Sequence, residues 1–254
     1  MDLSPEPSKF YTGLVAQVHS ALATSQVSAE ECVPFLKQSG GPTLQLACGT
    51  GYPLLELVAR GYAVHGLDSS QEMLARCREN AVSRGINVAL HHGEMQSFSA
   101  PRAYQAIFLA GPSFTLLTSD RDAMRTLARI RTHLVPGGSI RIPLEIIHPD
   151  TARTGVRPRR TVTTEGDALS LELIALSSSP DQRSWTYRLR YARTSRSGAS
   201  ESLERDWRRR WWSQEDFSAM LRAAGFRRVT FQSVDGGQAR PDARAFIALA
   251  EKRG

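Results

Sequence analysis

The spacing of apolar positions first predicts helices at the start of the chain. Over residues 9–23, apolar side chains recur every three or four positions, which places them on one face of a helix. Ser28 is a suitable N-cap, and Glu31 three residues later is typical of a capped helix start, so a second helix is predicted to run to Lys37. We therefore interpret residues 1–40 as an N-terminal helical segment.

Between residues 43 and 144, short apolar runs alternate with helix-like segments, a pattern typical of parallel strands joined by crossover helices. A helix from Ser213 to Gly225 and two more strands follow near the C-terminal end. The sequence therefore predicts an α/β fold with a mostly parallel seven-stranded sheet flanked by helices. The expected strands are residues 43–46, 63–67, 87–91, 105–110, 139–144, 228–234 and 243–250, and the expected helices include 52–60, 71–84 and about 120–134. Residues 136–138, Pro-Gly-Gly, are expected to close the last of these helices.

Between residues 158 and 212 the period of the apolar positions changes to two, as in antiparallel strands with one covered face. Turn-forming residues divide this stretch into roughly four strands. We interpret residues of about 150–212 as an antiparallel β cap that is inserted into one domain covering residues 1–254.

The cysteine spacing and the distribution of apolar residues indicate in which compartment the protein is expected. Cys32, Cys48 and Cys77 lack CxxC spacing, so we interpret them as reduced core residues. The first residues lack a basic segment followed by an apolar core, and no apolar run approaches the roughly 20 residues of a membrane span, so a cytoplasmic protein without membrane contact is expected.

The formal net charge of +7 leaves two interpretations open, because only three of the 32 basic residues are lysines. A basic surface for a polyanion is one interpretation. The other is the arginine bias that a GC-rich coding sequence produces.

A glycine-containing turn follows the first predicted strand. Gly49 and Gly51 allow a ligand to approach the backbone, and the helix behind them offers free N–H groups. Leu54 stands where a dinucleotide fingerprint requires glycine, and no P-loop lysine follows. Asp68 ends the second apolar run, where nucleoside-binding folds place a ribose carboxylate. A structural tight turn, and a helix-capping role for Asp68, remain open.

Four motifs, taken in this order, resemble the class I S-adenosylmethionine-dependent methyltransferases: residues 46–51, 66–74, 93–95 and 134–138. The resemblance covers about residues 9–145 and part of the C-terminal end. It is strongest to bacterial small-molecule methyltransferases with antiparallel strands inserted after strand five. It implies a doubly wound, Rossmann-like sheet, S-adenosyl-L-methionine as cofactor, and methyl transfer to an O, N or C atom of a small molecule.

The resemblance also implies roles for individual residues. Asp68 would accept hydrogen bonds from both ribose hydroxyls, Glu94 from the adenine amino group, and the Ala110 carbonyl from the ammonium group of the cofactor. Many relatives have aspartate in place of Glu94, so a solvated loop carboxylate remains an alternative there. Tyr11 would close over the cofactor, or it is a core tyrosine of its helix. The full set of implied cofactor residues is Tyr11, Ala47, Gly49, Gly51, Asp68, Ser69, Met73, Glu94, Met95 and Ala110.

Catalytic residues are harder to predict. Methyl transfer from a sulfonium is an in-line displacement that alignment and exclusion of water can accelerate without a dedicated base. Where a base is needed, the candidates are Glu145 and His148, which follow strand five, and Tyr11. A structural role for His148 remains open. No group of residues has metal-ligand spacing, so no metal is expected.

Residues 205–212 interleave arginines with tryptophans. Such a stretch can stack on bases and pair with phosphates, or it is the last cap strand with its arginines solvated or paired to Glu201 and Glu204. Residues 110–114 replace the Asn/Asp-Pro-Pro-Tyr/Phe motif of nucleic-acid amino-methylating enzymes, so a nucleic-acid partner is disfavoured. An anionic or natural-product acceptor fits the arginine-rich cap.

Two alternatives to this function stay open. One is an RNA methyltransferase, and the other is an S-adenosylmethionine-binding cyclase or scaffold protein that transfers no methyl group. We expect a monomer or a homodimer.

Overall fold

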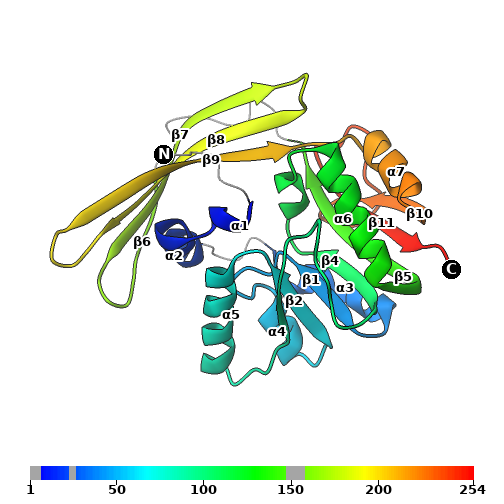
Figure 1. The fold of residues 1–254 in the computed structure, drawn as a ribbon, viewed down its shortest axis with the longest axis horizontal. Coiled ribbons are helices and arrows are strands. Elements are labelled where there is room, and N and C mark those ends of the chain that lie inside the picture. The colour runs from blue at the N-terminus through cyan, green and yellow to red at the C-terminus, as the bar shows by residue number, and fades with distance from the viewer. Residues whose placement is uncertain (1–6, 23–26, 147–157) are drawn as a thin grey trace.

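The structure is a computed structural model that describes residues 7–22, 27–146 and 158–254. Its central sheet consists of β1 Thr43–Leu46, β2 Val64–Asp68, β3 Leu90–His92, β4 Tyr104–Leu109, β5 Leu134–Glu145, β10 Phe226–Gln232 and β11 Ala245–Lys252. The strands lie in the order β10-β11-β5-β4-β1-β2-β3, and those from β5 to β3 are parallel (Figure 1). The mostly parallel seven-stranded sheet is thereby confirmed.

The connections leave β1 in the middle of the sheet, with β2 on one side and β4 on the other. In open sheets of this kind, ligands bind beyond the carboxyl ends of the strands where the strand order reverses. The two last strands run against this direction, because β11 pairs antiparallel with both β5 and β10. The position between the ends of β1 and β4 is therefore the expected place for a site.

Helices cover both faces of this sheet. They are α1 Pro7–Phe10, α2 Gly13–Leu22, α3 Ala29–Ser39, α4 Leu54–Ala59, α5 Gln71–Ser83, α6 Asp120–His133 and α7 Gln214–Ala223, with a short 3-10 helix, η1 Ser113–Leu116. One core cluster joins the sheet to α6 and α7, and a second joins it to α3, α4 and α5. All three cysteines are free and buried, as predicted.

A second sheet extends from the central one as the cap (Figure 1). Its four antiparallel strands are β6 Arg159–Val162, β7 Ala168–Ser179, β8 Ser184–Thr194 and β9 Ser200–Arg210, in that order. A third cluster of apolar side chains, including Val18 of α2 and Tyr191 of β8, lies between α2 and this sheet. The inserted antiparallel cap is confirmed for residues 159–210.

The single helix predicted over residues 9–23 is wrong, because the chain breaks between α1 and α2. The hydroxyl of Thr12 donates to the Lys9 carbonyl at 3.0 Å and so satisfies the end of α1. Gly13 has a φ of 55°, a left-handed conformation that interrupts a right-handed helix. Apolar spacing alone continues across this break, which is why the pattern did not reveal it.

The Pro-Gly-Gly sequence at residues 136–138 does not simply close a helix, as predicted, but lies inside β5. The register between β4 and β5 shifts there, since Tyr104 pairs with Leu134 whereas Ala106 pairs with Ser139. A Cβ at Gly138 would lie 3.1 Å from the Gln105 carbonyl oxygen, so a side chain there would crowd the backbone of β4. Other predicted bounds differ by up to three residues at an end.

Candidate functional site

A cavity of about 740 Å³ lies where the carboxyl ends of the parallel strands meet the cap. Its floor is formed by the loops after β1, β2, β3 and β4, and its other walls by α1, α2 and residues of the cap strands β6, β7 and β9. The implied cofactor residues that line it are Tyr11, Ala47, Gly49, Asp68, Ser69, Met73, Glu94, Met95 and Ala110. Residues far apart in the sequence are thus brought to one cavity.

The turn after β1 is shaped by two residues in the left-handed region. Ala47 has a φ of 52° and Gly49 a φ of 54°. Between them, the Cys48 N–H donates to the Leu67 carbonyl at 3.0 Å, which ties the turn to the end of β2. Gly49 adopts this conformation without strain, whereas Ala47 adopts it although its Cβ disfavours the left-handed region.

Asp68 is the best-defined acidic group of the site. Its Oδ2 accepts from the Gly49 N–H at 2.8 Å and its Oδ1 from the Ser70 N–H at 2.9 Å. Only 7% of Asp68 is exposed. Burial raises the pKa of its carboxyl above the usual value, while the N–H groups of Ser70 and Gly49 act in the opposite direction. A carboxylate has about four acceptor positions, so this one can accept a further hydrogen bond besides those from the backbone.

The N-cap of α5 lies two residues after Asp68 and belongs to Ser70. The Ser70 hydroxyl accepts from the Met73 N–H at 3.2 Å and donates to the Tyr11 carbonyl at 2.6 Å. The carboxylate of Glu72 accepts from the Gly13 N–H at 2.7 Å. The start of α5 therefore holds the junction of α1 and α2 over the cavity. The capping role that the sequence left open for Asp68 is filled by Ser70.

Two of the remaining implied residues have partners within the protein. Gln96 donates through Nε2 to Oε2 of Glu94 at 2.8 Å, so one oxygen of that carboxylate is already used. The Ala110 carbonyl accepts from Arg141 at 3.3 Å, and the neighbouring Leu109 carbonyl at 3.0 Å. Burial lowers the pKa of the Arg141 guanidinium. A carbonyl oxygen has two lone pairs, so Ala110 retains one acceptor position.

Gly51 is not among the residues that line the cavity. A Cβ at this position would lie 2.7 Å from Cγ of Leu55 and 2.8 Å from Sγ of Cys77. The structure thus places Gly51 where α4 and α5 pack closely behind the turn.

The aromatic wall of the cavity comes from the N-terminal helices and the cap. Phe10 stacks on Trp207 of β9 at a centroid distance of 6.1 Å, and Tyr11 meets His19 edge to face at 4.7 Å. Burial, and the nearby Tyr191 and Asp68, raise the pKa of the Tyr11 hydroxyl above its usual range. Tyr11 is therefore a neutral phenol at physiological pH.

His19 lines the cavity, although the sequence did not single it out. Burial and the nearby Arg159 lower the pKa of His19 to about 4, so its ring is neutral at physiological pH. Its Nδ1 is buried and has no hydrogen-bond partner. The sequence feature that could have identified His19 is its position beside Val15, Val18 and Leu22, in the apolar stripe of a predicted helix.

Glu145 and Arg209 form an ion pair across the mouth of the cavity, at 3.2 Å between Oε2 and Nη1. The same arginine donates through Nε to the Thr115 hydroxyl at 2.8 Å and lies over the Trp207 ring at 5.5 Å. Of the two other predicted catalytic residues, Tyr11 lines the same cavity, whereas His148 lies outside the described residues. Arg209 therefore ties the cap to the tip of β5.

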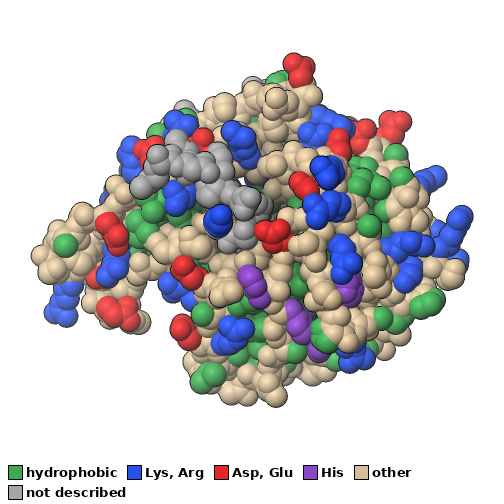
Figure 2. Space-filling view, in the orientation of Figure 1, with side chains coloured by type: hydrophobic (Ala, Val, Ile, Leu, Met, Phe, Trp, Pro, Cys, Tyr) green, Lys and Arg blue, Asp and Glu red, His purple; other side chains and the backbone are tan. Residues whose placement is uncertain are grey.

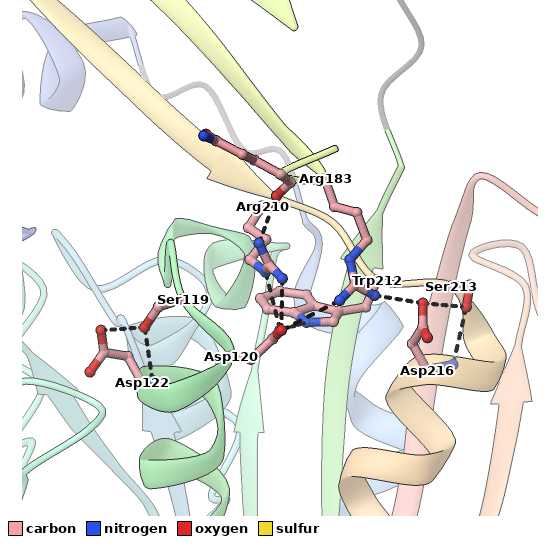
Figure 3. Close-up of polar contacts among 9 residues, drawn as sticks. Ser119, Asp120, Asp122, Arg183, Arg210, Trp212, Ser213 and Asp216 are labelled. Atoms are coloured by element: carbon pink, nitrogen blue, oxygen red, sulfur yellow. Dashed lines mark hydrogen bonds and ion pairs between the residues drawn. The ribbon is translucent and has the colours of Figure 1, made fainter. Parts of the chain in front are cut away.

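A second set of contacts anchors the cap where β9 enters α7. Asp120 accepts from Arg210 at 2.7 Å and from Trp212 Nε1 at 2.7 Å, and Arg183 approaches it to 3.4 Å (Figure 3). Arg183 also pairs with Asp216 at 2.8 Å. Burial alone raises the pKa of Asp120, but hydrogen bonds from Trp212 and Arg210 outweigh this and lower it below the usual value.

Most arginines of the cap strands are paired with carboxylates rather than gathered on one surface. Examples are Arg188 with Asp206 at 2.8 Å and Arg190 with Glu204 at 3.0 Å. Figure 2 shows Lys and Arg side chains interspersed with Asp and Glu on the visible face. Residues 205–210 belong to the last cap strand, as one of the two interpretations expected, but the option that their arginines pair with Glu201 and Glu204 is wrong: Glu204 pairs with Arg190 and Glu201 with Arg193.

Within the described ranges, no group of three or more His, Cys, Asp or Glu residues is arranged to hold a metal ion. In the same ranges, no helix has the length and apolar character that crossing a bilayer requires.

Comparison with known proteins gives the same picture of the fold. Residues 43–138 match the family model described as "Methyltransferase domain". The CcbJ methyltransferase from Streptomyces caelestis superimposes with a TM-score of 0.76 at 18% identity, covering 98% of this chain and 100% of that one. The sugar N-methyltransferase KedS8 from Streptoalloteichus superimposes with a TM-score of 0.68 at 18% identity, covering 100% and 95%.

Curated relatives match over part of their length. The dTDP-3-amino-3,6-dideoxy-alpha-D-glucopyranose N,N-dimethyltransferase of Streptomyces fradiae is 30% identical over 55% of this chain and 58% of its own. The glycine/sarcosine N-methyltransferase of Aphanothece halophytica is 30% identical over 46% of this chain and 45% of its own. The chain thus spans about half the length of these two relatives.

Proposed function

On the premise that this chain belongs to the class I S-adenosylmethionine-dependent methyltransferases, to which its domain match and its fold assign it, we propose that it methylates an amino group of a small molecule. The observation that carries the proposal is the Asp68 carboxylate at the floor of the cavity, held by the Gly49 and Ser70 N–H groups. The cofactor is proposed to be S-adenosyl-L-methionine.

The residues present fit this cofactor. Asp68 is buried and aligned by backbone donors that include Gly49 and Ser70, and its carboxylate has acceptor capacity left for the ribose of the cofactor. Gly49 leaves the turn beside it without a side chain, and a Cβ there would meet only the Met73 methyl group, at 3.6 Å. Glu94 keeps one oxygen that Gln96 does not use, and that oxygen is available to an amino group of the adenine.

When bound, S-adenosyl-L-methionine supplies an electrophilic methyl group on a sulfonium. The protein's part is to align an acceptor and to exclude water. Tyr11 and His19 are both neutral at physiological pH, so they contact an acceptor as hydrogen-bonding groups without charge. Glu145 at the tip of β5 remains the proposed catalytic carboxylate, with its position fixed by Arg209.

The acceptor class rests on the relatives and on the shape of the cavity. Two curated relatives are named for methylation of amino nitrogens, one on a nucleotide-linked sugar and one on an amino acid. The cavity, at about 740 Å³ and covered by the cap, suits a small molecule. The pairing of the cap arginines gives the RNA alternative no specific support.

The cofactor is tested by calorimetric titration with S-adenosylhomocysteine, the demethylated product. We expect binding on the order of micromolar, and a loss of about tenfold or more in Asp68→Asn and Asp68→Ala. Asp181→Ala, a change at an exposed position in the turn between β7 and β8, serves as control and should bind like the parent protein. Absence of binding by the folded parent protein would refute the proposal.

The reaction is tested by mass spectrometry of amino sugars incubated with the protein and S-adenosylmethionine, beside the same sugars with a hydroxyl in place of the amine. Methylation of the amino compounds alone supports the proposed nitrogen acceptor. Methylation of only the hydroxyl compounds would show an oxygen methyltransferase instead. Cofactor binding without any transfer across the panel would favour the scaffold alternative.

A further inference from the structure

Two histidines and a tyrosine of the central sheet meet at a place that the proposed reaction does not use. His65 lies on β2, His91 on β3 and Tyr104 on β4. None of the three is among the residues that line the cavity. His65 and Tyr104 stand near the starts of their strands, whereas the cavity lies beyond the strand ends.

The register of β2 and β3 brings the two histidines to one face of the sheet. His65 precedes Leu67 by two residues, so their side chains point to the same face. Leu67 is the partner of His91 in the pairing of β2 with β3, which places His91 on that face as well. The two histidines are 26 residues apart in the sequence, so no local spacing could have revealed the pair.

Three polar atoms converge on this face. Nδ1 of His65 lies 3.0 Å from the Tyr104 hydroxyl oxygen and 3.3 Å from Nε2 of His91. A neutral imidazole nitrogen carries either one proton or one lone pair, so Nδ1 cannot form a full hydrogen bond with both neighbours. One metal ion, in contrast, accepts lone pairs from several donors at once.

The distance between the two imidazole nitrogens indicates which ion would fit. Zn²⁺ binds histidine nitrogens at about 2.0–2.1 Å in tetrahedral geometry, which separates two nitrogens on one ion by about 3.3–3.4 Å. At the same bond length, a square-planar ion such as Cu²⁺ brings neighbouring nitrogens to about 2.8–3.0 Å. The 3.3 Å between Nδ1 of His65 and Nε2 of His91 therefore favours tetrahedral coordination.

Both imidazoles are in the form that binds metal. Burial lowers the pKa of His65 and of His91, so both rings are neutral at physiological pH and no proton competes with an ion. Both side chains are half-buried, so an ion can reach them from solvent. The positive charge of Arg102 also lowers the pKa of His65, and the same charge weakens the attraction of a cation.

We propose that His65 and His91 form a zinc site, with the Tyr104 hydroxyl as a third donor and water completing the tetrahedron. The ion joins β2 to β3, the edge strand of the central sheet. It stabilises this edge by binding the folded protein. The site is separate from the cavity, so the inference does not depend on the proposed methyl transfer.

The test is calorimetric titration of the full chain with Zn²⁺, on protein without a histidine tag and treated with a chelator. We expect binding on the order of micromolar, weakened about tenfold or more in His65→Gln and in His91→Gln. His92→Gln is the matched control, because His92 is the next residue of β3 and its Nε2 contacts the Ser69 carbonyl at 3.0 Å instead. Its affinity should stay within about twofold of the parent value.

Thermal unfolding gives a second measurement. Zn²⁺ should raise the Tm of the parent protein and of His92→Gln, and leave the Tm of His65→Gln unchanged. Arg102→Gln should bind Zn²⁺ more tightly than the parent, because the substitution removes a positive charge that acts on His65.

Absence of Zn²⁺ binding by the folded parent protein would overturn the inference. Equal affinity in the parent and in both His65→Gln and His91→Gln would place the ion elsewhere and overturn it as well. His91→Gln, a change on an edge strand, keeps the test decisive if His65→Gln does not fold. Binding of S-adenosylhomocysteine should be the same in all the folded variants, which keeps this test apart from that of the proposed function.

Discussion

The buried indole of Trp212 donates its Nε1–H to the carboxylate of Asp120 at 2.7 Å, and this contact joins the end of the cap to the first turn of α6 (Figure 3). Trp212 is 1% exposed and packs edge to face against Phe114 of η1. The residue that ends the cap insertion is thus also part of the core beneath the cavity.

Asp120→Ala should lower the free energy of unfolding by about 1–3 kcal/mol, because it leaves the buried Trp212 N–H without an acceptor. The Asp120 side chain is 48% exposed, so its ion pairs with Arg210 and Arg183 add little in salt. Urea unfolding measures the effect. Asp242→Ala, in an exposed pair, is the control and should stay within about 0.5 kcal/mol of the parent. Equal values for both variants would contradict the prediction.

His19 should make the protein less stable in mild acid. Its folded pKa of about 4 lies below the unfolded value of 6.5, so the unfolded chain binds more protons between these values. The stability is complete above pH 6.5 and falls by up to about 3 kcal/mol as the pH decreases to 4. His19→Phe should flatten this part of the pH profile in urea unfolding. An unchanged slope in the variant would show that another group is responsible.

Alanine at three glycines should separate packing, strain and ligand approach. Gly51→Ala places a Cβ 2.7 Å from Leu55 and should cost about 2 kcal/mol or more. Gly49→Ala meets no closer atom than 3.6 Å, so it should cost only about 1–2 kcal/mol of left-handed strain, yet weaken S-adenosylhomocysteine binding. Gly85 has a φ of 64° and open space where a Cβ would lie, so Gly85→Ala adds left-handed strain without a clash and is the control.

Thermal unfolding and calorimetry measure these effects. A Gly85→Ala variant that binds as weakly as Gly49→Ala would show that strain anywhere in the fold, rather than ligand approach, weakens binding.

Arg209→Gln should loosen the cap locally. The substitution removes the contacts to Glu145 and Thr115 that hold β9 against the central sheet. We expect amide hydrogen exchange in β9 to rise by about tenfold, while exchange in β1 and β4 is unchanged. Arg190→Gln, which breaks an exposed pair within the cap, is the matched control. A similar rise in both variants would argue against an anchoring role for Arg209.

Most of the central fold could be predicted from the sequence, because the spacing of apolar residues there has the period of the strand or helix that the backbone forms. Residues 43–46 and 71–84 are recovered almost to the residue as β1 and α5. The break at Gly13 was not visible, since apolar spacing continues across it and the interruption depends on one left-handed residue. The strand that passes through residues 136–138 was also missed, because local turn chemistry there is overruled by pairing with β4.

At the site, the motif residues were easier to predict than their neighbours. Asp68 and Gly49 stand at fixed places after consecutive parallel strands, so their convergence follows from the fold. His19 and Arg209 reach the same cavity from elements whose position depends on how the cap docks. No pattern within either segment encodes that docking.

The start of α5 binds the junction of α1 and α2. These contacts affect the order in which parts of the chain can fold during synthesis. Tyr11 and Gly13 find their partners Ser70 and Glu72 59 residues later, and Leu22 meets Arg159 137 residues later. During synthesis, the first helices emerge well before the surfaces that bury them. These helices can complete their contacts only once Arg159 has been added, which is after all five parallel strands have been made.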